Sequence, residues 1–281
     1  QITFFKVVYR RHTNFSMESI EQTYSGSQGF GSKVTASISR NGDLVHNMYV
    51  EWNPSAFFGT TNAGHVAANL GHTLLSEIEL EIGGQRIDRH YGDWLNIWNE
   101  LTQEPGKQAG YDNMVGNTVA LTGTGHESTE VTTLYVPLQF WFCRNPGLAL
   151  PLIALQYHEV KINLEFRQKE ETYVTSSSVI ECSGTGTGCQ VCVPSLEAAS
   201  LYVDYIYLDT DERRRFAQVS HEYLIEQLQF TGDESVTSTN VKVKLNFNHP
   251  CKELIWVVQR DDVVAPMSAP NTSVGTRLMQ T

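Results

Sequence analysis

The chain has 281 residues, of which 41% are hydrophobic, so it is long enough to bury the core of one large domain or two ordinary ones. Its formal net charge is −11 and no Lys- or Arg-rich tract offsets that charge, which argues against direct binding of nucleic acid. No apolar run approaches the roughly 20 residues of a membrane helix, and the first residues do not resemble a signal peptide, so neither is predicted.

The chain contains five cysteines, an odd number that does not suit a secreted disulfide framework. We therefore expect reduced cysteines and assembly in the cytosol. Cys182, Cys189 and Cys192 cluster with C-x6-C-x2-C spacing inside a Gly/Ser/Thr-rich loop. A structural zinc site normally needs four ligands, and no fourth ligand is evident. Ordinary loop cysteines are the preferred interpretation, and the state of these three is left open.

The first predicted strand covers residues 2–11. Residue 1 is a glutamine that leads directly into this strand, so we expect the start of the protein to be missing. Residues 33–40 and 44–52 alternate apolar and polar side chains on either side of Asn41-Gly42-Asp43. Because these three residues tolerate positive φ, the pattern predicts a β-hairpin.

A short Ala-rich helix is predicted within residues 61–70, followed by a second hairpin. Its strands are residues 75–82 and 85–90, and Gly83-Gly84 forms the turn. Residues 91–101 place large apolar side chains at helical spacing and predict an amphipathic helix that lies against the strands. The apolar residues of this helix are Trp94, Leu95, Ile97, Trp98 and Leu101.

Residues 104–130 are polar and Gly-rich and predict a long loop. An aromatic strand is predicted at residues 131–142, where Pro137 indicates an edge or bulge position rather than a central one, because proline cannot donate to a strand ladder. Residues 157–166 alternate and predict a half-buried strand. Residues 168–194 contain the cysteine cluster and predict another surface loop.

Residues 201–230 read as a strand, a short helix and a second strand. The first strand covers residues 201–208. Asp209 precedes Glu212 by three residues, the spacing of a helix N-cap, so a helix is expected to start there. The second strand covers residues 223–230. Further strands are predicted at residues 241–248 and 254–259, and an irregular tail at residues 266–281.

The stretch YLDTDERRRFAQVSHEYLIEQ, residues 207–227, resembles the segment that joins the two halves of a known viral protein. That protein is the double jelly-roll major capsid protein of nucleocytoplasmic large DNA viruses, the phycodnavirus, mimivirus and iridovirus relatives. Residues 2–15, 135–155 and 246–258 resemble the same family, so the likeness covers most of the chain.

The resemblance implies an all-β fold of tandem jelly-roll sandwiches with a few short helices. Residues 1–208 would form the first jelly roll, residues 209–218 a connecting helix, and residues 219–281 the beginning of a second jelly roll. A complete eight-stranded jelly roll needs well over about 100 residues, so the second barrel is expected to be incomplete in this chain.

The resemblance also implies a structural function. Three copies would form a pseudo-hexagonal capsomer, and capsomers would tile an icosahedral virus shell that is assembled in the host cytoplasm. Implied partners are the chain itself, neighbouring capsomers, and minor capsid and penton proteins; the family's shell overlies an internal membrane. We expect residues 91–101 and 104–130 to supply apolar trimer contacts.

Motifs for chemistry are not found. His126, His158 and His221 each precede a glutamate but lack the second histidine of a zinc-protease helix. The glycines of residues 184–188 imitate a phosphate loop, but no helix is predicted after them. We therefore predict no catalytic, cofactor-binding or metal-binding residue and no enzyme activity.

Two features of the sequence have other interpretations. The arginines of residues 213–215 lie beside acids and favour a structural clamp between the two barrels rather than a nucleic-acid site. Asn14 and Asn271 begin glycosylation sequons, which matter only if the chain enters the secretory route. The alternative functions are a carbohydrate-binding or carbohydrate-cleaving β-sandwich and, less favoured, a cupin-like metalloenzyme.

Overall fold

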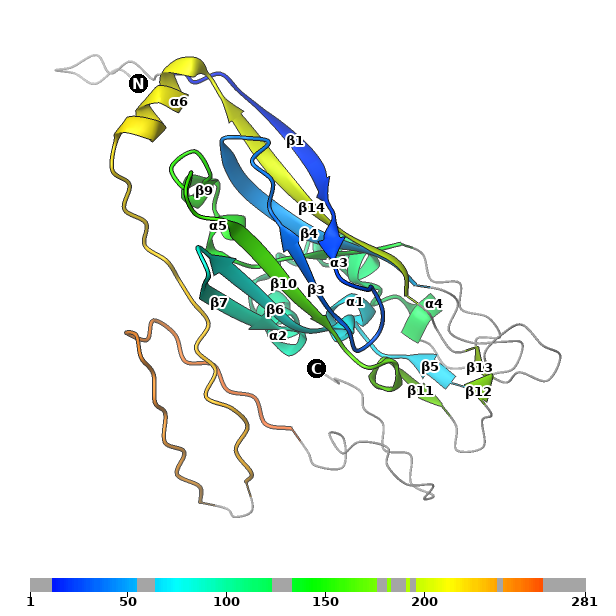
Figure 1. The fold of residues 1–281 in the computed structure, drawn as a ribbon. Helices are drawn as coiled ribbons and strands as arrows, with labels where there is room; N and C mark the ends of the chain where they lie inside the picture. Colours follow the sequence, from blue (N-terminus) through cyan, green and yellow to red (C-terminus); the bar gives the residue numbers. More distant parts are fainter. Residues whose placement is uncertain are drawn as a thin grey trace.

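The computed structural model describes residues 12–54, 64–122, 133–175, 181–182, 191–192, 196–236 and 240–259. Two five-stranded sheets pack against each other as a sandwich, and a helix leads from the sandwich into an extended segment (Figure 1). The first sheet has the order β1-β14-β4-β8, with β9 paired to β4, and the second has the order β2-β3-β10-β6-β7. All ladders within these two sheets are antiparallel.

The strands of the first sheet are β1 (Phe15–Gln22), β4 (Leu44–Pro54), β8 (Leu134–Pro137), β9 (Leu150–Pro151) and β14 (Leu196–Leu208). Those of the second sheet are β2 (Tyr24–Ser25), β3 (Lys33–Ser37), β6 (Leu75–Ile82), β7 (Gln85–Tyr91) and β10 (Val160–Phe166). Two small sheets pair β5 (Gly64–Val66) with β11 (Tyr173–Thr175) and β12 (Glu181–Cys182) with β13 (Val191–Cys192). The helices are α1 (Leu70–Leu74), α2 (Gly92–Thr102), α3 (Gln108–Val115), α4 (Val119–Thr122), α5 (Trp141–Arg144) and α6 (Thr210–Gln218), with short 3-10 turns at Pro146–Leu148 and Lys169–Glu171.

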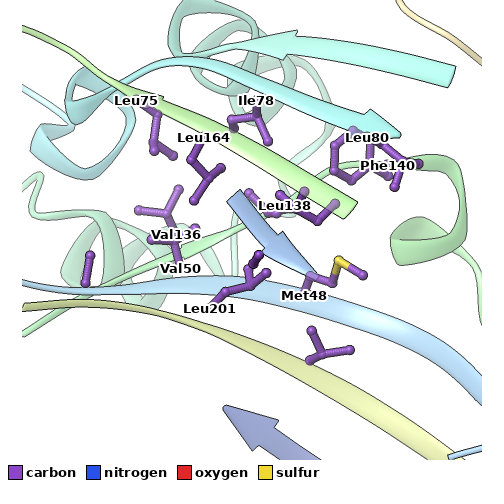
Figure 2. Close-up of a cluster of buried hydrophobic side chains, with 14 of the residues drawn as sticks. Met48, Val50, Leu75, Ile78, Leu80, Val136, Leu138, Phe140, Leu164 and Leu201 are labelled. Atoms are coloured by element: carbon purple, nitrogen blue, oxygen red, sulfur yellow. The ribbon is translucent and has the colours of Figure 1, made fainter. Parts of the chain in front are cut away.

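The core lies between the two large sheets. Alternate residues of each strand point inward, so β10 buries every second side chain along its length. Figure 2 shows Met48 and Val50 of β4 and Leu201 of β14 on one side, and Ile78 and Leu164 of the second sheet on the other. Burial of this apolar surface is the main stabilising contribution, at about 25 cal/mol per Å².

The predicted hairpin of β6 and β7 is confirmed. Ile82 pairs with Gln85, and the two residues between them are Gly83 and Gly84 with φ values of 61° and 81°. A two-residue turn of this kind needs positive φ at both positions, which glycine adopts without steric cost.

The predicted hairpin of residues 33–40 and 44–52 is wrong, although both strands exist. β3 pairs with β2 and β10, whereas β4 pairs with β14 and β8, so the two strands lie in opposite sheets. The connection crosses between the sheets instead of turning back. Gly42 is required for space rather than for φ, because an added Cβ would lie 2.7 Å from the Cβ of Tyr205. Local turn chemistry does not reveal which sheet the second strand joins.

The Ala-rich helix predicted within residues 61–70 is also wrong. Residues 64–66 form β5, which pairs with β11 across more than a hundred residues of sequence, and α1 begins only at Leu70. Residues 61–63 lie outside the described residues. The tertiary pairing overrides a weak local preference for helix.

The predicted loop at residues 104–130 is partly helical. α3 and α4 occupy much of its first part, and residues 123–130 lie outside the described ranges. Tyr111 and Val115 are four residues apart and both buried, which gives α3 one face for packing. The polar composition of the stretch concealed this short spacing.

The remaining strand predictions hold in the sandwich and fail beyond it. β8 is an edge strand, as Pro137 indicates, but it ends there and α5 follows at Trp141. β10 and β14 occur as predicted, and so does α6. Residues 223–230, 241–248 and 254–259 form no strand ladder in the described part of the chain, and the strand and tail predicted at residues 2–11 and 266–281 lie outside it. A strand requires a hydrogen-bonded neighbour, and the described residues offer these segments none.

Candidate interaction surface

Helix α6 begins at an N-cap formed by Asp209, whose side chain accepts a hydrogen bond from the backbone N–H of Thr210 at 2.7 Å. The carboxylates of Asp211 and Glu212 lie in its first turn and Arg215 in its last, which matches the helix dipole. The chain therefore leaves β14 and turns into a helix at a defined residue.

The side chain of Asp43 joins α6 to the sandwich. Arg213 donates from Nε to Asp43 Oδ1 at 2.9 Å and from Nη2 to Oδ2 at 3.0 Å, a bidentate pair. The same carboxylate accepts from the backbone N–H of Leu208 at 2.8 Å. Asp43 is buried at the crossover between β3 and β4, so one side chain connects the crossover, the end of β14 and the helix.

Apolar contacts reinforce this junction. Phe216 of α6 packs with Leu208 against a small buried cluster of Leu44, Ala149 and Ile206. The ring of Phe216 stacks on His221, with centroids 5.0 Å apart, and its carbonyl is hydrogen-bonded to His221 Nε2. The chain therefore stays close to the sandwich as it leaves the helix.

The segment after α6, residues 219–236 and 240–259, is here called the post-helix segment. Its first part runs along β7, the edge strand of the second sheet (Figure 1). The backbone N–H of Leu228 donates to Asp88 Oδ1 at 3.2 Å, Gln227 donates to the carbonyl of Ile87, and Phe230 meets Tyr91 edge to face. Side-chain hydrogen bonds, rather than a strand ladder, hold it there.

The acceptor in this contact, Asp88, is an inward-facing charged residue. Asp88 and His90 are both buried, and His90 Nε2 lies 3.1 Å from Asp88 Oδ2. The His90 ring stacks on Phe140 with centroids 4.7 Å apart. The sequence interpretation missed this pair; two polar residues at inward positions of an alternating strand are the signal that could have identified it.

The post-helix segment exposes an unusual amount of apolar surface. The side chains of Leu224, Trp256 and Val258 are 81%, 77% and 80% exposed. Other exposed apolar residues of the segment are Val219, Ile225, Phe230, Val236, Val241, Val243, Leu245, Leu254 and Val257. So many exposed apolar side chains are typical of a surface that packs against further protein.

Helix α2 packs through a different face from the one that the sequence predicts. Its buried side chains include Leu95 but also Asn96 and Asn99, and Asn96 accepts a hydrogen bond from Asn69 at 2.6 Å. Trp94 and Trp98 are half-buried and contact each other, and Arg144 lies over the Trp98 ring at 4.4 Å. Leu101 is exposed. The helix thus presents aromatic and apolar groups to solvent.

A cavity of about 510 Å³ lies between the post-helix segment and the loop after β9. Its lining includes Trp141, Leu155, Tyr157, Phe216 and Tyr223, and no carboxylate contributes to it. An apolar cavity without convergent acids does not suit acid–base chemistry at a sugar.

The residues that the sequence singled out for chemistry are dispersed. His158 lies before β10 and His221 after α6, and His126 lies outside the described residues. The backbones of Cys182 and Cys192 pair across the parallel β12-β13 bridge, but Cys189 is not described. Within the described residues no cluster of three or more His, Cys, Asp or Glu could hold a metal, and no helix has both the length and the apolar character that crossing a bilayer requires.

Two family models match the chain. The model described as "Major capsid protein N-terminus" covers residues 3–209, and the one described as "Large eukaryotic DNA virus major capsid protein" covers residues 212–277. The chain is 62% identical over 258 residues to the major capsid protein of Pyramimonas orientalis virus, covering 92% of this chain and 60% of that protein. It is 46% identical over 266 residues to the major capsid protein of Paramecium bursaria Chlorella virus 1, covering 91% and 55%.

Solved structures agree in fold. A quasi-atomic model of the PBCV-1 virus capsid is similar at a TM-score of 0.66 and 45% identity, over 88% of this chain and 57% of that one. The Faustovirus major capsid protein matches at 0.59 with 12% identity, over 77% and 58%, a likeness of fold alone. The all-β double jelly-roll fold class is confirmed. The chain spans 55% to 60% of the length of the two relatives described above.

Proposed function

The chain belongs to the family of major capsid proteins of large eukaryotic DNA viruses, and from this membership we propose that it builds an icosahedral virus shell. The observation that carries the proposal is that the two family models together cover residues 3–277 with only residues 210–211 between them. Its location is the virion, and its assembly takes place in the host cytoplasm.

We propose the domain division that the sequence predicts. Residues 1–208 are the first jelly roll, residues 209–218 the connecting helix, and residues 219–281 the beginning of the second. Two observations support this division. The boundary of the family models falls at the start of α6. The post-helix segment has alternating apolar side chains that are exposed to solvent. Strand partners from the second jelly roll would cover that surface and complete its ladders.

The mechanism is association without catalysis. Three copies form a pseudo-hexagonal capsomer, and capsomers contact one another, minor capsid proteins and penton proteins. We place part of the trimer contact at α2, because Trp94, Trp98 and Leu101 present apolar surface there. The net charge of −11 is unfavourable for nucleic acid, so the protein encloses the genome without binding it directly.

The alternative of a carbohydrate-active β-sandwich requires a cleft in which exposed aromatics face a pair of carboxylates. The cavity between the post-helix segment and the loop after β9 has aromatic residues but no carboxylate. A cupin-like metalloenzyme requires a cluster of metal ligands, which the described residues do not provide. A second pocket of about 460 Å³ at α6 does bring Glu212 and Glu222 beside Phe216 and Tyr223, but the family membership favours the capsid function over a carbohydrate-active one.

Light scattering coupled to size exclusion tests the trimer. We expect three times the chain mass of 31.6 kDa at micromolar concentration. Leu101 is 61% exposed on α2, so Leu101→Glu should convert trimers to monomers, because a charge cannot be buried in an apolar interface without large cost. The matched control is Tyr157→Glu, at a residue that is 94% exposed away from α2. A monomeric parent protein, or equal effects of the two substitutions, would contradict the proposal.

A further inference from the structure

The first sheet has an unusual distribution of charge. Its strands β1, β4, β8, β9 and β14 contain no lysine or arginine. The acids in those strands are Glu18, Glu21, Glu51, Glu197 and Asp204. The second sheet mixes both signs, with Lys33, Lys161, Arg86 and Arg89 among its acids. The two sides of the sandwich therefore differ in charge although they share one chain and one core.

The two sheets also differ in whether their charged side chains form ion pairs. On the second sheet, Arg89 bridges Glu77 and Glu79 at 2.9 Å each, and Lys33 pairs with Glu165 at 2.6 Å. On the first sheet, among the residues that the structure describes, Glu18, Glu21, Glu51 and Asp204 make no ion pair. Ion pairs with described residues therefore do not neutralise the charges of these four acids.

Three tyrosines lie among these acids. Tyr202 of β14 and Tyr49 of β4 are register partners, and their rings stack with centroids 5.2 Å apart and an angle of 7°. Tyr135 of β8 meets Tyr49 edge to face at 6.0 Å. The rings therefore form one continuous row across three adjacent strands.

Strand registry places the acids beside these rings. Glu21 of β1 is opposite Tyr202, and Glu51 of β4 is opposite Tyr135. Asp204 follows Tyr202 by two residues, so it lies on the same face of β14. Partial burial, together with the negative charge of Glu51, raises the pKa of Tyr135 and of Tyr202, so both hydroxyls stay protonated. We call Glu21, Tyr49, Glu51, Tyr135, Tyr202 and Asp204 the acidic tyrosine face.

The stacking alone has a structural explanation, because cross-strand aromatic pairs stabilise a sheet. That explanation does not require that every charged side chain of the strands that carry the rings, β4, β8 and β14, and of the adjacent β1 be acidic. Aromatic faces attract cations through their quadrupole, and carboxylates next to them add to the attraction. Both features of the face suit the same kind of ligand.

We propose that the acidic tyrosine face docks a Lys- or Arg-rich extended segment of another protein. An extended chain can lie across the outer face of these adjacent strands, with cationic side chains over the tyrosine rings and their charged ends paired with Glu21, Glu51 and Asp204. A second copy of this chain is the less suitable occupant, since each copy carries a net charge of −11. The face is thus separate from the apolar surfaces that serve self-association.

Fluorescence anisotropy with labelled octalysine as the probe tests this docking. The patch variant is Glu21→Gln/Glu51→Gln/Asp204→Asn, which keeps side-chain size and removes three negative charges. The control variant is Glu104→Gln/Glu170→Gln/Glu234→Gln, which removes three exposed charges away from the first sheet. The patch variant should weaken octalysine binding by about ten-fold or more, whereas the control should change it by less than about two-fold.

A second variant separates charge from aromatic recognition. Tyr202→Leu keeps apolar bulk but removes the ring face, and it should weaken binding by about three-fold or more with the acids intact. Equal weakening by the patch and control variants would mean that only net charge attracts the probe, and would overturn the proposal. Binding of a neutral cello-oligosaccharide to this face in preference to octalysine would also overturn it, and so would no octalysine binding at low salt.

Discussion

The contact between Arg213 and Asp43 gives a prediction that can be worked through in energies. Asp43 receives three hydrogen bonds, two from Arg213 and one from the backbone N–H of Leu208. Hydrogen bonds to a charged group contribute about 1.5–3 kcal/mol each, and removal of one partner of a buried pair costs about 3–5 kcal/mol. The Arg213 side chain is 52% exposed and can be rehydrated. Asp43→Ala should therefore lower the free energy of unfolding by about 3 kcal/mol, the lower end of the range for a buried pair.

The partner substitution should cost less. Arg213→Ala leaves Asp43 with its bond from Leu208, so we expect a loss of about 1–2 kcal/mol. The double variant should cost little more than Asp43→Ala alone, which gives a coupling energy of about 1–2 kcal/mol. The control is Arg214→Ala, because Arg214 is 64% exposed and its nearest carboxylate oxygen, in Asp211, is 4.0 Å away; it should change stability by less than about 0.5 kcal/mol.

Urea unfolding followed by tryptophan fluorescence measures the free energies of unfolding of the parent protein and the four variants. A coupling energy near zero would show that the two side chains stabilise the protein independently, and would refute the clamp. So would a loss from Arg214→Ala as large as that from Arg213→Ala, since the effect would then belong to the charge of α6 rather than to one contact.

Three further predictions concern other parts of the fold. Gly92→Ala should destabilise the protein by about 3 kcal/mol or more, because the new Cβ would lie 2.2 Å from the Leu75 carbonyl oxygen. The control is Gly110→Ala in α3, which has open space around it and should be neutral or stabilising. Thermal unfolding of both variants checks this. Burial of the His72 ring lowers its pKa from 6.5 to about 4. The neutral ring therefore contributes fully to stability above pH 6.5, and this contribution, about 3 kcal/mol in total, is lost as the pH falls towards 4. His72→Gln should flatten that part of the pH–stability curve. Asp88→Ala should accelerate hydrogen exchange at the Leu228 amide by about ten-fold or more, while exchange in the core of β10 stays unchanged.

The sequence predicts those elements whose determinants are local. The β6-β7 hairpin depends on two adjacent glycines, and α6 depends on Asp209 at its first turn. The alternation of β10 and β14 survives because one face of each strand meets the core. In each case the deciding residues are neighbours in the chain.

The failures have non-local causes. The separation of β3 and β4 into two sheets depends on pairing with β10 and β14, which lie more than a hundred residues further along the chain. Helix α2 buries Asn96 because Asn69 offers a hydrogen bond there, so its packing face is not its most apolar one. The alternating segments after α6 were predicted as strands from side-chain pattern alone, and pattern cannot supply a hydrogen-bonded neighbour.

The candidate surfaces show the same division. The position of α6 and its arginines was predictable, but the partner of Arg213 is 170 residues away in a stretch that was interpreted as a turn. The acidic tyrosine face combines strands β1, β4, β8 and β14, so its charge imbalance becomes visible only when the sheet order is known. The sequence shows which residues are charged or aromatic, but only the strand order shows which of them lie side by side.

Electron microscopy of the concentrated protein tests the central claim most directly. A shell-building protein should form blocks with three-fold symmetry that pack into hexagonal arrays or closed particles. Separate particles of the 31.6 kDa chain, with no lattice at any concentration or salt, would contradict the account.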